Sequence, residues 1–264
     1  TRVLSCPRTG KHDREPGSRG AGTAVRATLN LEILAYETTH LGYLCLRRRE
    51  LLSRPGTVIT EITLDQQLLM SSYNTVSERA LADEALARHR GHDLSVLVGG
   101  LGLGYTAANV LQSERVRRVE VIELFGAVVG FLREGLLPLS AKLLADPRLR
   151  VREGDAYATL RERADEHWDI VLIDIDHSPQ DHLGIGNESF YTESGLVRAK
   201  HHLALGGILA VWSYAESSPF VDALHAAFEV VQVVPVSYVN DLVDEEHTDW
   251  LFIAQDEPAS PRKR

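Results

Sequence analysis

The stretch LSVLVGGLGLGYTAANVL, at residues 94–111, constrains the fold of this chain more than any other segment. An apolar run is followed by Gly100, Gly102 and Gly104 at alternate positions, and then by a helical pattern. This order predicts a strand, a tight turn and a helix, because glycine lets the backbone turn sharply and lets a ligand approach it closely. A turn without a ligand could use the same residues, but the strand context and the next acidic residue favour a binding site. A dinucleotide fingerprint would require glycine at Tyr105, and no phosphate-loop motif is present.

Strand and helix patterns alternate after residue 91. Apolar, β-branched runs predict strands at 94–98, 118–123, 149–153, 169–174, 207–213, 229–236 and 249–255. Helices are expected to begin near Gly104, Phe125, Ala156 and Tyr191. Buried strands separated by helices predict an α/β domain with a doubly wound, Rossmann-like, mainly parallel seven-stranded sheet. Ligands of such sheets bind beyond the carboxyl ends of the strands, where the strand order reverses.

Residues 29–72 carry a different, β-like pattern. HLGYLCLRR and TVITEITLD alternate on either side of the turn signal RPG, which predicts a small N-terminal β-hairpin subdomain. Thr75 and Glu78 match a capping box, so a helix is expected over 78–90, ending at Gly91. We therefore divide the chain into a flexible tail at 1–25, the β subdomain with its linking helix at 26–90, a nucleoside-binding catalytic domain at 91–256 and a C-terminal tail at 257–264.

Charge and composition argue against several classes of protein. The 264 residues carry a formal net charge of −9, whereas a nucleic-acid-binding protein would present a basic face. Apolar runs are too short to cross a bilayer and no signal-like stretch is present at the N-terminus, so we expect a cytoplasmic protein with no membrane partner. Two cysteines, Cys6 and Cys45, lie far apart and indicate neither a disulfide framework nor a zinc site. The acidic balance would suit a small cationic substrate.

Acidic residues also follow the second and third core strands. Glu123 ends VEVIE, about twenty residues beyond the glycines, where a carboxylate can accept hydrogen bonds from both ribose hydroxyls. Asp155, in REGDAYATL, either caps the following helix or, with Ala156, contacts the amino edge of adenine. Together with the glycine turn, these residues predict a pocket for adenosine without a pyrophosphate, as in a ligand of the S-adenosylmethionine type.

The succession of motifs resembles the polyamine aminopropyltransferases (spermidine synthases), which have the class I fold of S-adenosylmethionine-dependent methyltransferases. The similarity runs from about residue 41 to 213 and includes LLMSSYNTVSERALADEAL, VGGLGLG, VEVIE, DPRLRVREGDA, DIVLIDIDHSP and FYTESGLVRAKHHLALGGILAVWS. It implies S-adenosylmethionine or decarboxylated S-adenosylmethionine as the cofactor, and alkylation (aminopropylation) of an amine substrate. It also implies that Asp174 is catalytic and orients or deprotonates that amine. An alkylamine is protonated at neutral pH, so a carboxylate can hold it in line and accept its proton.

Several positions depart from the family's pattern. Leu103 stands where the family's glycine loop carries an aspartate that meets the amine of the donor, and Thr75 stands where a glutamine is expected. Ala82 and Asp83 replace a tyrosine–histidine pair. These departures keep two alternatives open. One is an S-adenosylmethionine-dependent methyltransferase acting on a small-molecule acceptor, and the other is a catalytically degenerate relative that binds a nucleoside.

The acceptor side of the site is expected to include Tyr73, Glu78, Asp176 and Tyr191, although aromatic packing would equally explain the two tyrosines. DIDHSPQDH, at 174–182, is rich in oxygen ligands and could hold Mg²⁺ as in catechol-type O-methyltransferases. A second set of ligands is not evident, so we expect no metal. The apolar β subdomain could support a homodimer, as in the family that the chain resembles.

Overall fold

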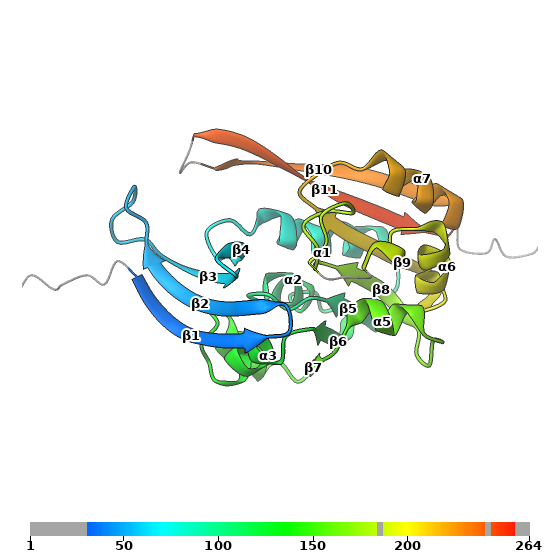
Figure 1. The fold of residues 1–264 in the computed structure, drawn as a ribbon. Helices are drawn as coiled ribbons and strands as arrows, with labels where there is room; N and C mark the ends of the chain where they lie inside the picture. The colour runs from blue at the N-terminus through cyan, green and yellow to red at the C-terminus, as the bar shows by residue number, and fades with distance from the viewer. Residues whose placement is uncertain (1–30, 184–186, 241–243, 257–264) are drawn as a thin grey trace, which may run out of the picture.

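The computed structural model describes residues 31–183, 187–240 and 244–256, which fold into two β-sheets joined by a helix (Figure 1). The N-terminal sheet contains β1 (Leu31–Thr39), β2 (Gly42–Glu50), β3 (Val58–Leu64) and β4 (Gln67–Ser71). The larger sheet contains β5 (Leu94–Gly99), β6 (Val116–Glu123), β7 (Leu149–Glu153), β8 (Trp168–Ile173), β9 (Leu203–Ser213), β10 (Val230–Asn240) and β11 (Glu245–Gln255). The helices are α1 (Val76–Arg88), α2 (Tyr105–Val110), α3 (Gly126–Arg133), α4 (Ser140–Ala145), α5 (Ala156–Arg161), α6 (Glu193–Lys200) and α7 (Ser218–Ala227), with a 3₁₀ turn, η1, at Asn187–Ser189.

The N-terminal sheet is a four-stranded antiparallel meander, which extends the expected hairpin by two strands. Its last turn uses two left-handed residues, Asp65 (φ 46°) and Gln66 (φ 71°), instead of the usual Asn-Gly. The Asp65 carboxylate compensates by accepting a hydrogen bond from the backbone N–H of Tyr43, at 2.8 Å. A turn made by these residue types gives little local signal, which is why β4 is hard to read from the sequence.

The larger sheet has the order β10-β11-β9-β8-β5-β6-β7. Strands β5 to β9 pair in parallel, whereas β11 pairs antiparallel with both β9 and β10. This arrangement confirms the predicted doubly wound, mainly parallel seven-stranded sheet. The chain proceeds from β5 outward to β6 and β7 and then returns to β8 on the other side of β5. The strand order therefore reverses between β5 and β8, and a ligand is expected at their carboxyl ends.

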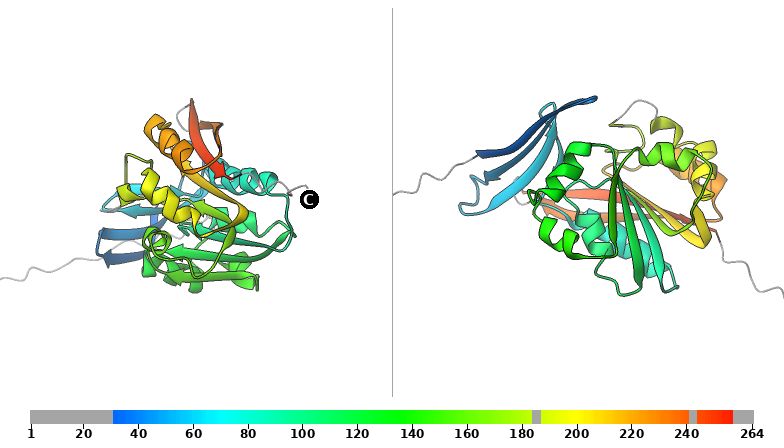
Figure 2. Two further views of the ribbon diagram at one scale, coloured as in Figure 1. Left: turned by 90° about the vertical axis from the view of Figure 1, so that its right-hand side faces the viewer. Right: turned by 90° about the horizontal axis from the view of Figure 1, so that it is seen from below.

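Helices cover both faces of this sheet, as the two turned views show (Figure 2). Along β5, Val96 and Val98 join a core cluster with α1 and α2, whereas Leu97 joins a second cluster with α5, α6 and α7. Alternate side chains of one strand thus enter opposite layers, which is why the strand sequences are apolar throughout. Each fully buried Val or Leu side chain contributes about 1.5–3 kcal/mol to folding. The core holds the carboxyl ends of β5 and β8 rigidly side by side.

The linking helix α1 is confirmed, but its predicted capping box is wrong. Thr75 precedes the helix without a side-chain capping bond, and its hydroxyl instead accepts a hydrogen bond from Arg79 at 3.1 Å. The Glu78 carboxyl, which a capping box would turn back toward Thr75, lines the cavity described below. Two helices, α4 and α7, have no counterpart in the sequence prediction.

The predicted tails at 1–25 and 257–264 lie outside the described residues, and the proposed domain boundaries remain a prediction. Among the helices of the described residues, none combines the length and hydropathy that crossing a bilayer demands.

Candidate functional site

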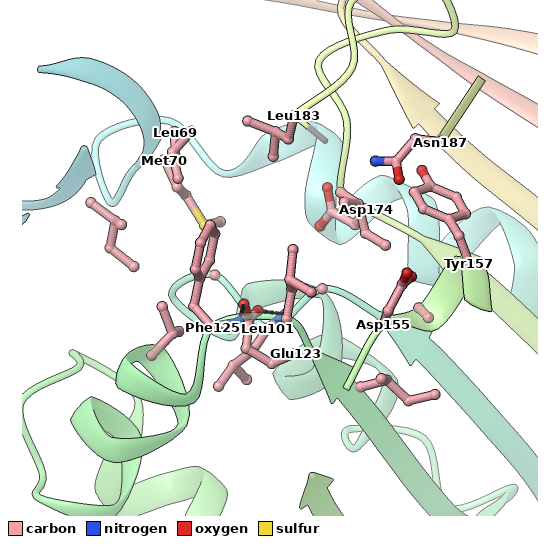
Figure 3. Close-up of a pocket in the computed structure, with 18 of the residues that line it drawn as sticks. Leu69, Met70, Leu101, Glu123, Phe125, Asp155, Tyr157, Asp174, Leu183 and Asn187 are labelled. Carbon is pink, nitrogen blue, oxygen red and sulfur yellow. Dashed lines mark hydrogen bonds between the residues drawn. The ribbon is translucent and has the colours of Figure 1, made fainter. Parts of the chain in front are cut away.

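A cavity of about 440 Å³ lies at the carboxyl ends of the central strands, where the strand order reverses (Figure 3). This volume is within the range of pockets that hold drug-sized ligands. The core domain supplies the glycine turn, the ends of β6, β7 and β8, and the start of α5. The N-terminal sheet supplies a mainly apolar wall made of Leu41, Ile62, Leu69 and Met70, together with His40. Both sheets therefore build the cavity.

The glycine turn brings two strand ends into direct backbone contact. Gly100 has φ +92°, and a Cβ placed on it would lie 2.2 Å from the backbone oxygen of Asp174. A Cβ on Gly102 (φ +50°) would lie 2.5 Å from the Met70 sulfur. Gly104 (φ +89°) precedes α2 in the left-handed conformation. Gly100 and Gly102 line the cavity, so these glycines satisfy both the tight turn and an open ligand surface.

Glu123 is buried at the end of β6 and holds the glycine turn in place. Its carboxylate accepts hydrogen bonds from the backbone N–H of Leu101 at 2.7 Å and of Phe125 at 2.9 Å, drawn as dashed lines in Figure 3. Burial raises the pKa of this carboxyl, and these backbone hydrogen bonds oppose the shift. Each carboxylate oxygen has further lone pairs, and Glu123 lines the cavity. The geometry is compatible with the predicted ribose contact, which remains a prediction.

Asp155 takes the first of the two roles that its sequence position left open, and the second stays a prediction. Its side chain caps α5 by accepting a hydrogen bond from the backbone N–H of Ala158 at 2.9 Å. It also lines the cavity together with Gly154 and Ala156. Both residues predicted to contact adenine, Asp155 and Ala156, therefore line the cavity.

Asp174 lies directly after β8 and lines the cavity, as does Glu78 of α1. The Thr106 hydroxyl donates a 2.6 Å hydrogen bond to the Asp174 carboxylate, and the Asp174 backbone N–H bonds to the Gly99 carbonyl at 2.9 Å. Burial raises the pKa of Asp174 to about 6, against the effect of Thr106 and with a further contribution from Asp249. Burial, followed by the charge of Asp174, raises the pKa of Glu78 to about 8. Paired carboxyls with raised pKa values in a cavity are typical of a site that handles protons or binds a cation.

Asp176 and Tyr191, both expected to bind substrate, do not line this cavity. The buried Asp176 carboxylate accepts hydrogen bonds from the Tyr157 hydroxyl at 2.9 Å, the Tyr191 hydroxyl at 3.0 Å, the Asn187 amide at 3.0 Å and the Leu183 N–H at 2.8 Å. Burial raises the pKa of both tyrosines, so their hydroxyls keep their protons and donate. Leu183, Asn187 and Tyr157 do line the cavity. Asp176 thus fixes three cavity-lining residues by hydrogen bonds, although it does not line the cavity itself.

We expect Asp176→Ala to lower the free energy of unfolding by about 2–4 kcal/mol, because it leaves buried donors without an acceptor. Chemical denaturation with a single cooperative transition would measure the loss. Asp181→Ala is the matched control from the same segment. The Asp181 side chain is half-exposed, with partners no closer than 3.4 Å, and should change stability by less than about 0.5 kcal/mol. Equal stability of the two variants would contradict the structural role of Asp176.

Other functional candidates were missed or are placed differently. Tyr73 does not line the cavity, whereas Trp212, which the sequence analysis did not single out as a site residue, does. The Met70 sulfur accepts a hydrogen bond from the backbone N–H of Leu103 at 3.0 Å, and the Leu103 side chain is fully buried. Asp249, on β11, has no linear motif around it and reaches the site only because β11 lies beside β9. The predicted strand 249–255 was the single sequence signal that could have drawn attention to it.

The acidic segment at 174–182 does not converge on one point. Asp174 bonds to Thr106, Asp176 to the two tyrosines, and Asp181 lies 3.8 Å from His177. Within the described residues, no three His, Cys, Asp or Glu side chains are grouped so that they could hold a metal ion. Cys45 is a buried free thiol, and Cys6 lies outside the described residues.

The strand order, the glycine turn and the acid-lined cavity define a class of domain: a Rossmann-like fold of the methyltransferase type with a nucleoside-sized pocket. Comparison with known proteins narrows this class. The fold is similar to that of spermidine synthase in complex with the transition state analogue AdoDATO, with a TM-score of 0.68, 16% identity, and coverage of 86% of this chain and 74% of the other. The spermidine synthase of Thermotoga maritima gives a TM-score of 0.64 with 17% identity, and covers 86% of this chain and 73% of its own. At sequence identities of 16% and 17%, these two comparisons show a common fold.

The sequence relatives are named polyamine aminopropyltransferases. The chain is 35% identical over 144 residues to polyamine aminopropyltransferase 2 of Streptomyces coelicolor, which covers 53% of this chain and 24% of that protein. It is 30% identical over 119 residues to the polyamine aminopropyltransferase of Oceanobacillus iheyensis, covering 44% of this chain and 22% of that protein. The matches thus span about a quarter of these relatives' length. No protein-family model matches the chain. The resemblance to polyamine aminopropyltransferases expected from the motifs is confirmed.

Proposed function

We propose that this protein is a spermidine-synthase-like transferase that alkylates an amine with decarboxylated S-adenosylmethionine, transferring an aminopropyl group. The donor's adenosine would lie between Glu123 and the Asp155–Ala156 turn. Its sulfonium would then face Asp174, which orients or deprotonates the acceptor amine. The names of the sequence relatives and the fold of the structural neighbours support this reaction class.

The charge of the cavity is the observation that carries the proposal. Its described lining contains four carboxyl side chains, from Glu78, Glu123, Asp155 and Asp174, and neither lysine nor arginine. The basic side chains that this lining does contain are the imidazoles of His40 and His177. A sulfonium donor and an ammonium acceptor are both cations. Either one would favour the ionised form of these carboxyls, including Glu78 with its raised pKa, and would meet no lysine or arginine in that lining.

The same charge distinguishes the two possible donors. S-adenosylmethionine carries a carboxylate that would find no lysine or arginine in this lining and would lie near Asp174 and Glu78. Its decarboxylated form lacks that group. We expect the decarboxylated donor to raise the melting temperature more than S-adenosylmethionine at equal concentration, because a ligand at 100 times its Kd stabilises the native state by about 2.7 kcal/mol. Differential scanning fluorimetry would measure the difference, with adenosine as the control.

A stronger stabilisation by S-adenosylmethionine would remove the aminopropyl reading and favour methyl transfer. One observation supports that second candidate. Leu103, at the position of the family's amine-binding aspartate, is apolar and turned into the core.

A turnover assay separates an enzyme from a protein that only binds a nucleoside. Release of a nucleoside thioether from either donor in the presence of diamines would establish turnover. Its absence, with binding retained, would favour a nucleoside-binding relative without catalysis.

The small-molecule amine partner, the cytoplasmic location and the homodimer remain predictions that accompany this proposal. Apolar side chains exposed on the N-terminal sheet are compatible with a homodimer. They include Leu31, Ile33, Tyr36, Tyr43, Val58 and Leu68.

A further inference from the structure

Three carboxyls, from Glu78, Asp174 and Asp249, interact electrostatically beside the cavity, and the Ser77 hydroxyl contacts two of them. Ser77 donates a 2.6 Å hydrogen bond to the Asp249 carboxylate and also lies 3.4 Å from the Glu78 carboxylate. Asp249 is buried on β11, whereas Glu78 lines the cavity on α1 and interacts electrostatically with Asp174. The Tyr238 hydroxyl, on β10, hydrogen-bonds to Asp249 from the other side. A continuous polar chain therefore runs from the cavity through the helix to the outer strands.

The proposed reaction releases a proton that some group must take. The acceptor's ammonium loses one proton, and its nitrogen lone pair forms a new bond to the carbon next to sulfur. The carbon–sulfur bond breaks, and its electron pair stays on sulfur as a neutral thioether. The product nitrogen keeps a positive charge, so one proton leaves the site for each group transferred. A base beside the nitrogen must hold that proton before it reaches solvent.

Asp174 and Glu78 differ in how they are held. Asp174 is fixed by the 2.6 Å bond from Thr106, which favours its charged form and sets its orientation. The Glu78 carboxylate is held by a hydrogen bond to its own backbone N–H and by a longer contact to Ser77, at 3.4 Å, and it lines the cavity. Asp174 is thus built to bind a cation in one orientation, and Glu78 to take up a proton.

Resting on the proposed function, we infer that Glu78 accepts the proton released by the acceptor nitrogen, and that Asp249, acting through Ser77, positions Glu78 for this transfer. Glu78 is therefore assigned as a catalytic residue, and Ser77 and Asp249 as positioning residues. Burial and the charge of Asp174 raise the pKa of Glu78 above that of an isolated glutamate, and the charge of Asp249 adds to this shift.

Charged and titratable groups reach Glu78 from each element that packs around it. They are Asp174 after β8, Asp249 on β11, Tyr238 on β10 and Tyr105 on α2. Trp212 of β9 adds a buried indole N–H, which makes no hydrogen bond of good geometry with the described residues but lies close enough to Asp249 to lower its pKa. The charges of Asp174 and Asp249 raise the pKa of Glu78, whereas the Ser77 hydroxyl lowers it. Changes at Asp249 and at Ser77 should therefore have opposite signs.

The test uses the pH dependence of kcat/KM for the full chain with decarboxylated donor and diamine. Activity requires ionised Glu78. The pH profile of kcat/KM should therefore have an acidic limb, below which activity is lost as Glu78 takes up a proton. Asp249→Asn removes a negative charge and should move the limb to lower pH, while Ser77→Ala should move it to higher pH. Glu84→Gln, on the solvent side of the same helix, is the matched control and should leave the limb in place. The inference would be overturned if the limb moved in the same direction in both variants, or if it did not move in Asp249→Asn.

A second measurement does not depend on turnover. The ¹³C carboxyl resonance of Glu78, assigned by its loss in Glu78→Gln, can be titrated in the unliganded protein and in Asp249→Asn. We expect its midpoint to fall in Asp249→Asn, in the same direction as the limb of the activity profile. If the protein processes neither donor but this midpoint moves, the proposed reaction fails while the coupling of Asp249 to Glu78 stands. An unchanged midpoint would refute the coupling even in an active enzyme.

Discussion

Asp174→Asn is expected to lower kcat/KM by about 10² to 10⁴-fold, the range measured when a positioned acid–base or orienting group is removed. The amide keeps the shape of the side chain and can still accept the Thr106 hydrogen bond. It loses the charge that attracts the acceptor's ammonium toward the sulfonium carbon. Steady-state kinetics, with release of the nucleoside thioether as the readout, would measure the loss.

The same variant should be more stable than the wild type at pH 8. Burial raises the pKa of Asp174 to about 6, above its value in the unfolded chain, so the folded state binds the proton more tightly. Its stability therefore falls as pH rises from about 4 to 6 and stays lower above that window, where the buried carboxylate is charged. A neutral amide avoids this cost, and we expect a gain on the order of 1–3 kcal/mol at pH 8 and little gain at pH 4.

Together these two readouts separate a functional role from misfolding. Asp181→Asn, on the exposed part of the same segment, is the matched control and should change neither activity nor stability appreciably. An Asp174→Asn protein with full turnover would refute the role assigned to this carboxylate. A variant that loses both activity and stability at pH 8 would show that Asp174 mainly supports the fold.

Glu123→Ala is expected to weaken donor binding by at least about 100-fold. A hydrogen bond to a charged acceptor contributes about 1.5–3 kcal/mol, and the proposed ribose contact involves two hydroxyls. The substitution also leaves the backbone N–H groups of Leu101 and Phe125 without their carboxylate partner, so the glycine turn loses the group that holds it. Isothermal titration calorimetry with adenosine and with the decarboxylated donor would measure the change.

A control on the same strand isolates the effect of position. Glu120, three residues earlier on β6, pairs with Arg152 at 2.8 Å at the protein surface. Its substitution by alanine removes the same chemical group but should leave nucleoside affinity within about twofold, because exposed ion pairs contribute little. Similar losses from Glu120→Ala and Glu123→Ala would indicate a general effect on the strand rather than a ribose contact.

Linear motifs located only part of the site. Gly100, Glu123 and Asp174 each follow a core strand, and parallel strands end at the same edge of the sheet, so their convergence was predictable. Asp176 shows the limit of this reasoning, because it lies two residues beyond Asp174 and yet turns into a buried network with Tyr157 and Tyr191. Whether an acid after a strand faces the ligand or the core depends on loop geometry that no spacing encodes.

What the sequence determined by itself was the mainly parallel sheet, the glycine turn at its switch point and the acids at the strand ends, because these follow from local periodicity and backbone conformation. Tertiary structure alone decided the apolar wall that Met70 and its neighbours provide, and the meeting of Glu78 with Asp249 through Ser77. Ser77 and Asp249 are 172 residues apart in the chain. The Asp249 side chain can reach Ser77 only after β11 has paired with β9. Contacts of this kind depend on how whole elements pack, and local sequence carries no signal for them.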